Sequence, residues 1–200
     1  ETTRPFTELA FVLGAKAEQV VDFFHTQNKK DNFNFSLQYR FSNSPGALKN
    51  QNANINNLRF TSHFKSNNRK YELFFVFLSN KNASSENGGL QSPGKLDSLS
   101  LNDPYELETR LGRSAAASRN PFNTNVSTGN IYAGSQFVIR QQYDLGKKDS
   151  SVVDSVTYRI FYPRLRLQHT LSVSSNEYQF LDTYVDSSKY RLYFNKPLAS

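Results

Sequence analysis

The amino-acid sequence predicts an all-β fold, an antiparallel transmembrane β-barrel with about eight strands in this chain. One observation is strict alternation in residues 31–43. Phe, Leu and Tyr occupy the odd positions from 33 to 41, and Asn, Ser, Gln and Arg occupy the even ones. A second is composition: hydrophobic residues make up only 37% of the 200 residues, yet there are 17 Phe and 11 Tyr. A polar chain rich in aromatics is typical of strands with one apolar face.

Each predicted strand is bounded by a turn signal. Gly14 separates the first two apolar runs, and the segment 66–68 is rich in Asn and reads as a tight turn. The apolar positions change from even to odd at Pro163, which predicts a bulge or a turn there. Residues 146–155 are interpreted as a charged connection. The predicted strands are 6–13, 18–27, 31–43, 57–65, 69–80, 130–145, 156–173 and 176–186.

The connections give a third observation. The segments 44–56 and 81–128 are long and rich in Asn, Ser, Gly and Pro, whereas the connections after the second and fourth predicted strands are short. Outer-membrane barrels show this alternation of long external loops and short periplasmic turns. Several runs also have the length of about 9–11 residues that a tilted strand needs to cross a bilayer. Residues 1–200 are therefore expected to form a single barrel domain with a long external loop at about 81–128.

Several classes of site are disfavoured. The chain has no Cys, which excludes disulfides and thiolate metal ligands. His25, His63 and His169 lie far apart, so no metal site is expected. The segment GLQSPGKL at 89–96 resembles a phosphate-binding loop, but Leu96 stands where Ser or Thr would bind Mg²⁺. With no G-x-S-x-G motif either, we expect no enzyme activity and no cofactor.

The net charge of +7 allows several partners. Basic residues are spread over many strands and interleaved with acidic ones, which disfavours a nucleic-acid site. Several lie on the polar phase of the predicted strands and are candidates for lining a lumen, where rings of basic side chains favour anions. The alternative is that they are solvated wall residues or pair with Glu72 and Asp144. The lumen-lining candidates are Arg40, Arg59, Lys65, Arg140 and Arg159.

Five segments in order resemble the β-barrel porin family of the Bacteroidota outer membrane. They are HTQN (25–28), FNFSLQYRFSNSPGALKNQN (33–52), SENGG (85–89), QQYDLGKKDS (141–150) and YRIFYPRLRLQHTL (158–171). The resemblance implies a barrel with more strands than this chain contains. The last residues, NKPLAS, lack the terminal aromatic of a closing strand. The chain is therefore expected to be the N-terminal part of such a barrel.

Together these features predict a porin-like protein of the bacterial outer membrane. It is expected to act as a passive channel for small solutes or as the barrel component of an outer-membrane complex. Its expected partners are outer-membrane lipid and other outer-membrane or periplasmic proteins, not nucleic acid. Two alternatives remain open: a soluble β-sandwich or small barrel used as a binding module, and a non-conducting structural subunit of an outer-membrane assembly.

Overall fold

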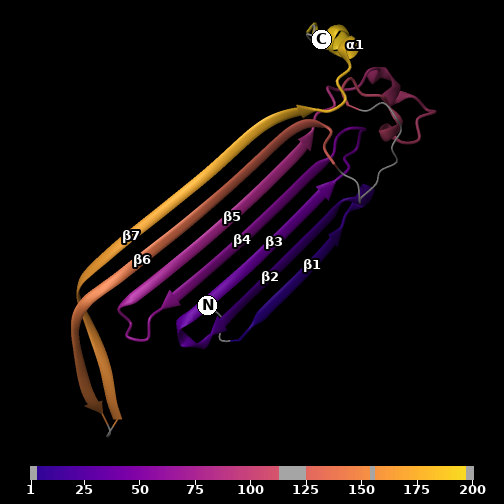
Figure 1. Ribbon diagram of the computed structural model, residues 1–200. Helices are drawn as coiled ribbons and strands as arrows, with labels where there is room; N and C mark the ends of the chain where they lie inside the picture. The colour runs from indigo at the N-terminus through magenta and orange to yellow at the C-terminus, as the bar shows by residue number, and fades with distance from the viewer. Residues whose placement is uncertain (1–3, 113–124, 154–155, 197–200) are drawn as a thin grey trace.

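A computed structural model describes residues 4–112, 125–153 and 156–196. These residues form one antiparallel sheet of seven strands, in which each strand pairs with its neighbour in chain order (Figure 1). The fold class predicted from sequence, all-β and antiparallel, is confirmed. The described sheet is open, with β1 and β7 at its edges. The strands are β1 (Phe6–Leu13), β2 (Gln19–Lys29), β3 (Phe33–Ser44), β4 (Ala53–Lys65), β5 (Tyr71–Ser85), β6 (Thr128–Val153) and β7 (Val156–Asp182).

The register gives the sheet two unlike faces. Residues paired across strands share a face, and successive residues alternate between faces. Leu37 pairs with Phe60, Phe60 with Phe77, and Phe77 with Phe137. We call the side that carries this row the apolar face. In β1, β2, β3 and β5 the odd-numbered residues lie on this face, and in β4 the even-numbered residues do. In β6 up to residue 145, and in β7 from residue 165, the odd-numbered residues lie on it.

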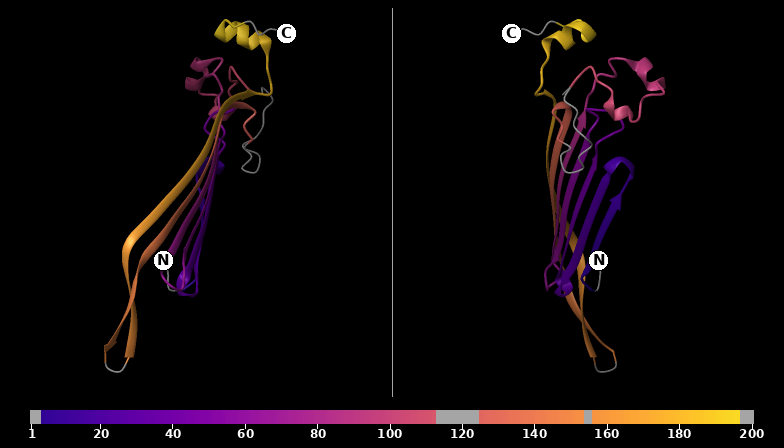
Figure 2. Two further views of the ribbon diagram at one scale, coloured as in Figure 1. Left: turned by 60° about the vertical axis from the view of Figure 1, so that its left-hand side comes forward. Right: turned by 90° about the vertical axis from the view of Figure 1, so that its right-hand side faces the viewer.

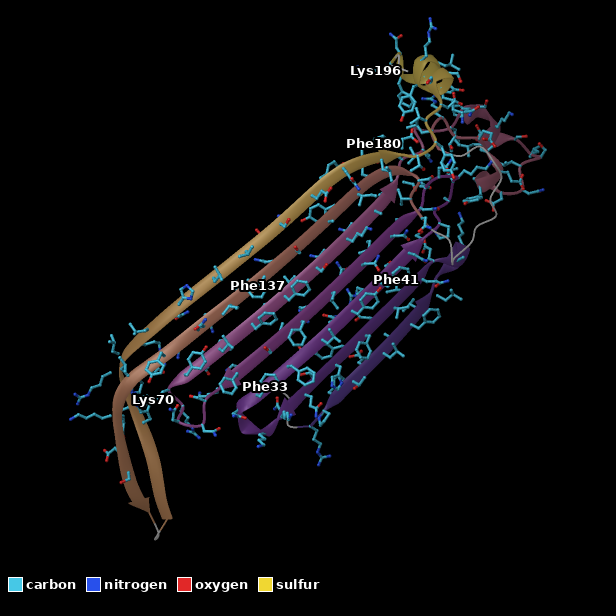
Figure 3. The ribbon with its side chains drawn as sticks, in the orientation of Figure 1. Phe33, Phe41, Lys70, Phe137, Phe180 and Lys196 are labelled. Carbon is cyan, nitrogen blue, oxygen red and sulfur yellow. The ribbon has the colours of Figure 1, made fainter. Side chains whose placement is uncertain are left out.

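Aromatic rings contact one another along the apolar face. The ring of Phe75 lies edge-on to those of Phe60 and Phe137, with centroids 5.7 and 5.1 Å away. Figure 3 labels Phe33, Phe41 and Phe137, which all lie on this face. The opposite side, the polar face, carries Asn, Ser, Gln and charged side chains at the intervening positions.

The apolar face is not covered by any other described part of the chain. The hydrophobic residues buried among the described residues are Leu90, Leu107 and Leu111, and all three lie in the β5–β6 connection. On the edge strand β1, Leu9 is 71% exposed, and Val173 on β7 is 55% exposed. In the left view of Figure 2 the strands appear edge-on as a single layer. A predicted sandwich would need a second layer, and the described residues form none.

The number of strands predicted from sequence, about eight, is wrong for the described residues, which form seven. Residues 146–155 were expected to be a connection, but β6 continues to Val153 and β7 starts at Val156. The seventh and eighth predicted strands are one strand, because Ser174 and Ser175 stay paired with Gln136 and Ser135. The predicted irregularity at Pro163 is confirmed: Gly146 pairs with Pro163 and Leu145 with Leu165, which leaves Arg164 as the extra residue of a bulge.

The two ends of the sheet differ. Short connections at 30–32 and 66–70 join β2 to β3 and β4 to β5 at one end. Beyond the bulge, β6 and β7 pair only with each other and project past that end as a two-stranded ribbon (Figure 1). The connections that follow β1, β3 and β5 lie together at the other end, near the C-terminal helix. The long connections therefore lie at one end, as the sequence predicted.

The β5–β6 connection begins at residue 86, later than the predicted 81, because β5 extends to Ser85. Its described part packs against the β3–β4 connection. Lys49, 4% exposed, donates from Nζ to Glu108 Oε1 at 2.6 Å. Thr109, 2% exposed, donates to the carbonyl of Leu111. The segment that resembled a phosphate loop forms a short 3-10 helix at Pro93–Asp97, without the strand and helix that nucleotide binding requires.

A single short α-helix follows the sheet in the described residues, α1 (Ser187–Phe194). Asp186 is its N-cap and accepts from the backbone N–H groups of Ser188 and Lys189. The Ser188 hydroxyl also donates to Asp186, and these bonds lower the pKa of its carboxyl. Among the described residues, no helix is long and apolar enough to cross a membrane.

Asp182 joins the end of the sheet to α1. Its carboxylate accepts from the Thr128 hydroxyl at 2.8 Å, from the Tyr184 N–H at 3.0 Å and from the Tyr190 hydroxyl at 2.7 Å. Thr128 is 1% exposed. Burial, and then the hydrogen bond to Asp182, raise the pKa of Tyr190 to about 12. The neutral phenol is therefore the form that holds α1 on the sheet.

Replacing Asp182 with alanine is expected to detach α1 and to leave the Thr128 hydroxyl without its acceptor, at a cost of about 1–3 kcal/mol. The pKa of Tyr190 should fall toward the ordinary tyrosine value of about 10. The Tyr190 pKa is measured by titrating phenolate absorbance. The titration of the same chain carrying Tyr190→Phe is subtracted, which isolates the signal of Tyr190. Glu177→Ala on the same strand is the control. An unchanged Tyr190 titration in Asp182→Ala would contradict this assignment.

Candidate functional site on the polar face

Four of the five predicted lumen-lining residues share the polar face. They are Arg40 on β3, Arg59 and Lys65 on β4, and Arg140 on β6. Alternation places them there because each follows an apolar residue that faces the other way. Arg159 is different: its backbone pairs with Ser150 in the projecting ribbon, and its side chain lies outside the described residues. That these side chains line a lumen stays a prediction.

One charged cluster lies on β2, β3 and β4. Asp22 and Arg40 are direct cross-strand partners, and the guanidinium donates to Asp22 Oδ2 from both Nε and Nη2. Gln38 also donates to Asp22, at 3.3 Å. Arg59 pairs with Gln38 and lines the same hollow of about 370 Å³. The hollow is lined by Glu8, Ala10, Asp22, Phe24, Gln38, Arg40 and Arg59.

A second cluster lies near the short-turn end. Glu72 lies 3.1 Å from His63 Nε2 and 3.5 Å from Lys65 Nζ. Asp144 on β6, 7% exposed, accepts two hydrogen bonds from Arg166 on β7, at 2.7 and 3.0 Å. A guanidinium that donates two N–H groups to the two oxygens of one carboxylate forms a geometrically specific ion pair. These contacts leave the polar face with local pairs of opposite charge instead of a continuous basic ring.

An aromatic stack interrupts the polar face. Phe74 on β5 pairs with His63 on one side and with Arg140 on the other. The His63 ring is parallel to the Phe74 ring within 5°, with centroids 4.3 Å apart. The Arg140 guanidinium lies 4.4 Å from the same ring centroid. Phe74 is therefore held between a histidine and a cation-π partner.

The three histidines do not converge. His25 and His169 lie on the apolar face, and Thr7 Oγ1 lies 2.7 Å from His25 Nδ1. His63 lies on the opposite, polar face. Across the described ranges, no group of three or more His, Cys, Asp or Glu side chains could hold a metal ion. The geometry is therefore that of an extended polar wall and not of a compact centre.

Sequence reasoning missed two side chains of these charged clusters, Asp22 and Arg166. Asp22 interrupts the apolar run of residues 20–24, and a lone carboxylate in such a run is a signal for a cross-strand partner. Arg166 lies on the polar phase of β7 beyond the bulge. The pairing alternative named Glu72 and Asp144 as partners of the predicted arginines. In the described residues Arg40 instead pairs with Asp22, while Glu72 lies beside Lys65 and Asp144 binds Arg166.

Comparisons with known proteins agree with this architecture. The sequence profile of a protein family described as "Putative porin" matches residues 1–198, nearly the whole chain. A search of curated proteins and a search of solved structures each gave no match. The family agrees with the all-β antiparallel sheet, its uncovered apolar face and its charged opposite face. By the match over residues 1–198, the chain belongs to this porin family.

Proposed function

We propose that the chain forms part of the wall of a passive channel for small solutes in the outer membrane of a Bacteroidota bacterium. The apolar face meets lipid, and the polar face meets the aqueous pore. The observation that carries the proposal is that the apolar face, rich in Phe and Leu, is left uncovered by the rest of the described chain. Contiguous apolar surface of this extent marks a membrane or protein contact. The proposal includes no catalytic step and no cofactor.

The strand lengths support a membrane span. β2, β3 and β4 contain 11, 12 and 13 residues. A tilted strand needs about 9–11 residues to cross the hydrocarbon layer. The ends of β3 and β4 therefore lie near the two interfaces, and the connections that follow β1, β3 and β5 are external in this arrangement.

Conductance and solubility test the proposal together. The chain, folded in detergent together with the strands that close its barrel and added to planar lipid bilayers, is expected to give stepwise increases in ion current. Without detergent it is expected to aggregate. A compact, soluble monomer by light scattering, with a cooperative melt, would overturn the proposal, because the apolar face would then need no lipid.

A second function is favoured by the open edges. In the described sheet, the outer edges of β1 and β7 pair with no strand, and a free edge is a template for further strands. The chain would then be a non-conducting structural subunit that pairs with other outer-membrane strands. Stable co-purification with a partner, together with the absence of conductance by the closed assembly, distinguishes this role from the channel.

A further inference from the structure

Two guanidiniums on the polar face form no salt bridge in the described part of the chain, although Asp22 interacts with one of them, Arg59, at longer range. Arg40 is bound by Asp22, Lys65 by Glu72 and Arg166 by Asp144. Arg59 and Arg140 are exposed and form no ion pair with any described residue. Their N–H donors are therefore available to an anionic ligand.

Apolar side chains lie between these two arginines. Four apolar side chains lie half-buried on the polar face, although most positions on that face are polar. They are Phe74, Val76 and Leu78 of β5 and Val138 of β6. These side chains remain partly exposed on a face that meets water in our proposal. They form an apolar strip, a surface on which the apolar part of a solute can lie.

The register fixes the arrangement across β4, β5 and β6. One row is Arg59, Leu78 and Gln136; the next is Thr61, Val76 and Val138; the third is His63, Phe74 and Arg140. The two arginines therefore occupy opposite corners, with the apolar strip between them. At ~3.4 Å per residue and ~4.8 Å per strand, their Cα atoms are about 17 Å apart.

Each arginine adjoins one end of the apolar strip. Arg59 and Leu78 line a common hollow of about 260 Å³, together with Asn57 and Asn80. Arg140 lies over the ring of Phe74 at the other end. A carboxylate bound to either guanidinium would thus leave its hydrocarbon part beside Val76.

We propose that this surface, defined by Arg59, Phe74, Val76, Leu78, Val138 and Arg140, is a binding site for amphipathic organic anions, carboxylates with an apolar or aromatic body. The inference rests on the proposed function, since it names the solute class of that channel. Guanidinium binds carboxylate in a bidentate, planar geometry, and the strip binds the hydrocarbon part through the hydrophobic effect. A small inorganic anion would use only the first of these.

The test measures block of the ion current through the chain, reconstituted with the strands that close its barrel, by 4-phenylbutyrate, acetate and 4-phenylbutylamine. Phenylbutyrate is expected to block at concentrations at least tenfold lower than the other two. Because either guanidinium can bind the carboxylate, Arg59→Gln and Arg140→Gln should each raise its half-blocking concentration about twofold. The double variant should raise it about tenfold, the effect of losing the charge-assisted contact. Val76→Ser should raise it several-fold. Arg166→Gln is the matched control, because it removes the same charge but its donors already bind Asp144 and it lines neither hollow beside Arg59.

Equal effects of Arg59→Gln and Arg166→Gln would overturn the site, because a general electrostatic field would then explain the block. Equal block by acetate would overturn the role of the apolar strip. Equilibrium binding of radiolabelled phenylbutyrate to proteoliposomes separates the two proposals. Binding that depends on Arg59 and Arg140 without conductance keeps the site and removes the channel. Conductance without selective binding keeps the channel and removes the site.

Discussion

Replacing Phe75 with arginine is expected to destabilise the membrane-inserted chain by about 2–4 kcal/mol, the cost of a cation at the midplane of a barrel's lipid face. Phe75 lies at the centre of the apolar face, in contact with Phe60 and Phe137. The fraction of chain folded into liposomes, measured by heat-modifiable gel mobility and far-UV circular dichroism, should fall sharply.

The neighbouring substitution Val76→Arg is the matched control. It adds the same cation one position along β5, on the polar face between Thr61 and Val138. Because that face meets water in our proposal, insertion should be nearly unchanged. If Val76→Arg abolished insertion and Phe75→Arg did not, the assignment of the two faces to lipid and water would be reversed.

Replacing Gly129 with valine is expected to separate β5 and β6 where the β5–β6 connection returns to the sheet. A Cβ at this position would lie 2.1 Å from the Ser84 carbonyl oxygen and 2.7 Å from Ser85 Cα. These are backbone atoms, which cannot move without breaking the strand pairing. The expected cost is on the order of 3 kcal/mol or more, measured as a lower urea midpoint in detergent.

Gly134→Ala on the same strand is the control for Gly129→Val. Its Cβ would meet only the Tyr132 hydroxyl at 2.7 Å and the Asn176 side-chain oxygen at 2.9 Å. Both atoms end side chains that can rotate away, so the urea midpoint should move little. Identical midpoints for the two variants would show that the close approach of Gly129 to β5 is not needed for stability.

Alternation was sufficient to predict the faces of β3 and β4, because one side of each strand is mainly apolar and the other polar. It failed for Gly146–Val153. That segment is polar and charged, and its ribbon lies beyond the other strands, so no apolar face imposes a period on it. The pair Ser174–Ser175 resembled a break for a related reason: polar residues on both faces near the end of a strand give no alternation.

The site was predictable only as a set of residue types on a face. The choice of Arg40, Arg59, Lys65 and Arg140 needed only the phase of each strand. Which cation is paired depends on register, and a shift of one residue would exchange the faces of a whole strand. The pairing of Asp22 with Arg40, and the position of Phe74 between His63 and Arg140, therefore required the structure.

The neighbour-to-neighbour order of the strands has a consequence for the kinetics of assembly. Most neighbouring strands in the described sheet are joined by a short connection. The exception is β5 and β6, which are joined by residues 86–127. Because the entropy cost of closure rises with the logarithm of loop length, the stack β1–β5 and the hairpin β6–β7 should form first and separately. Their joining is then the slow step, and shortening the β5–β6 connection should accelerate folding more than any change within the hairpins.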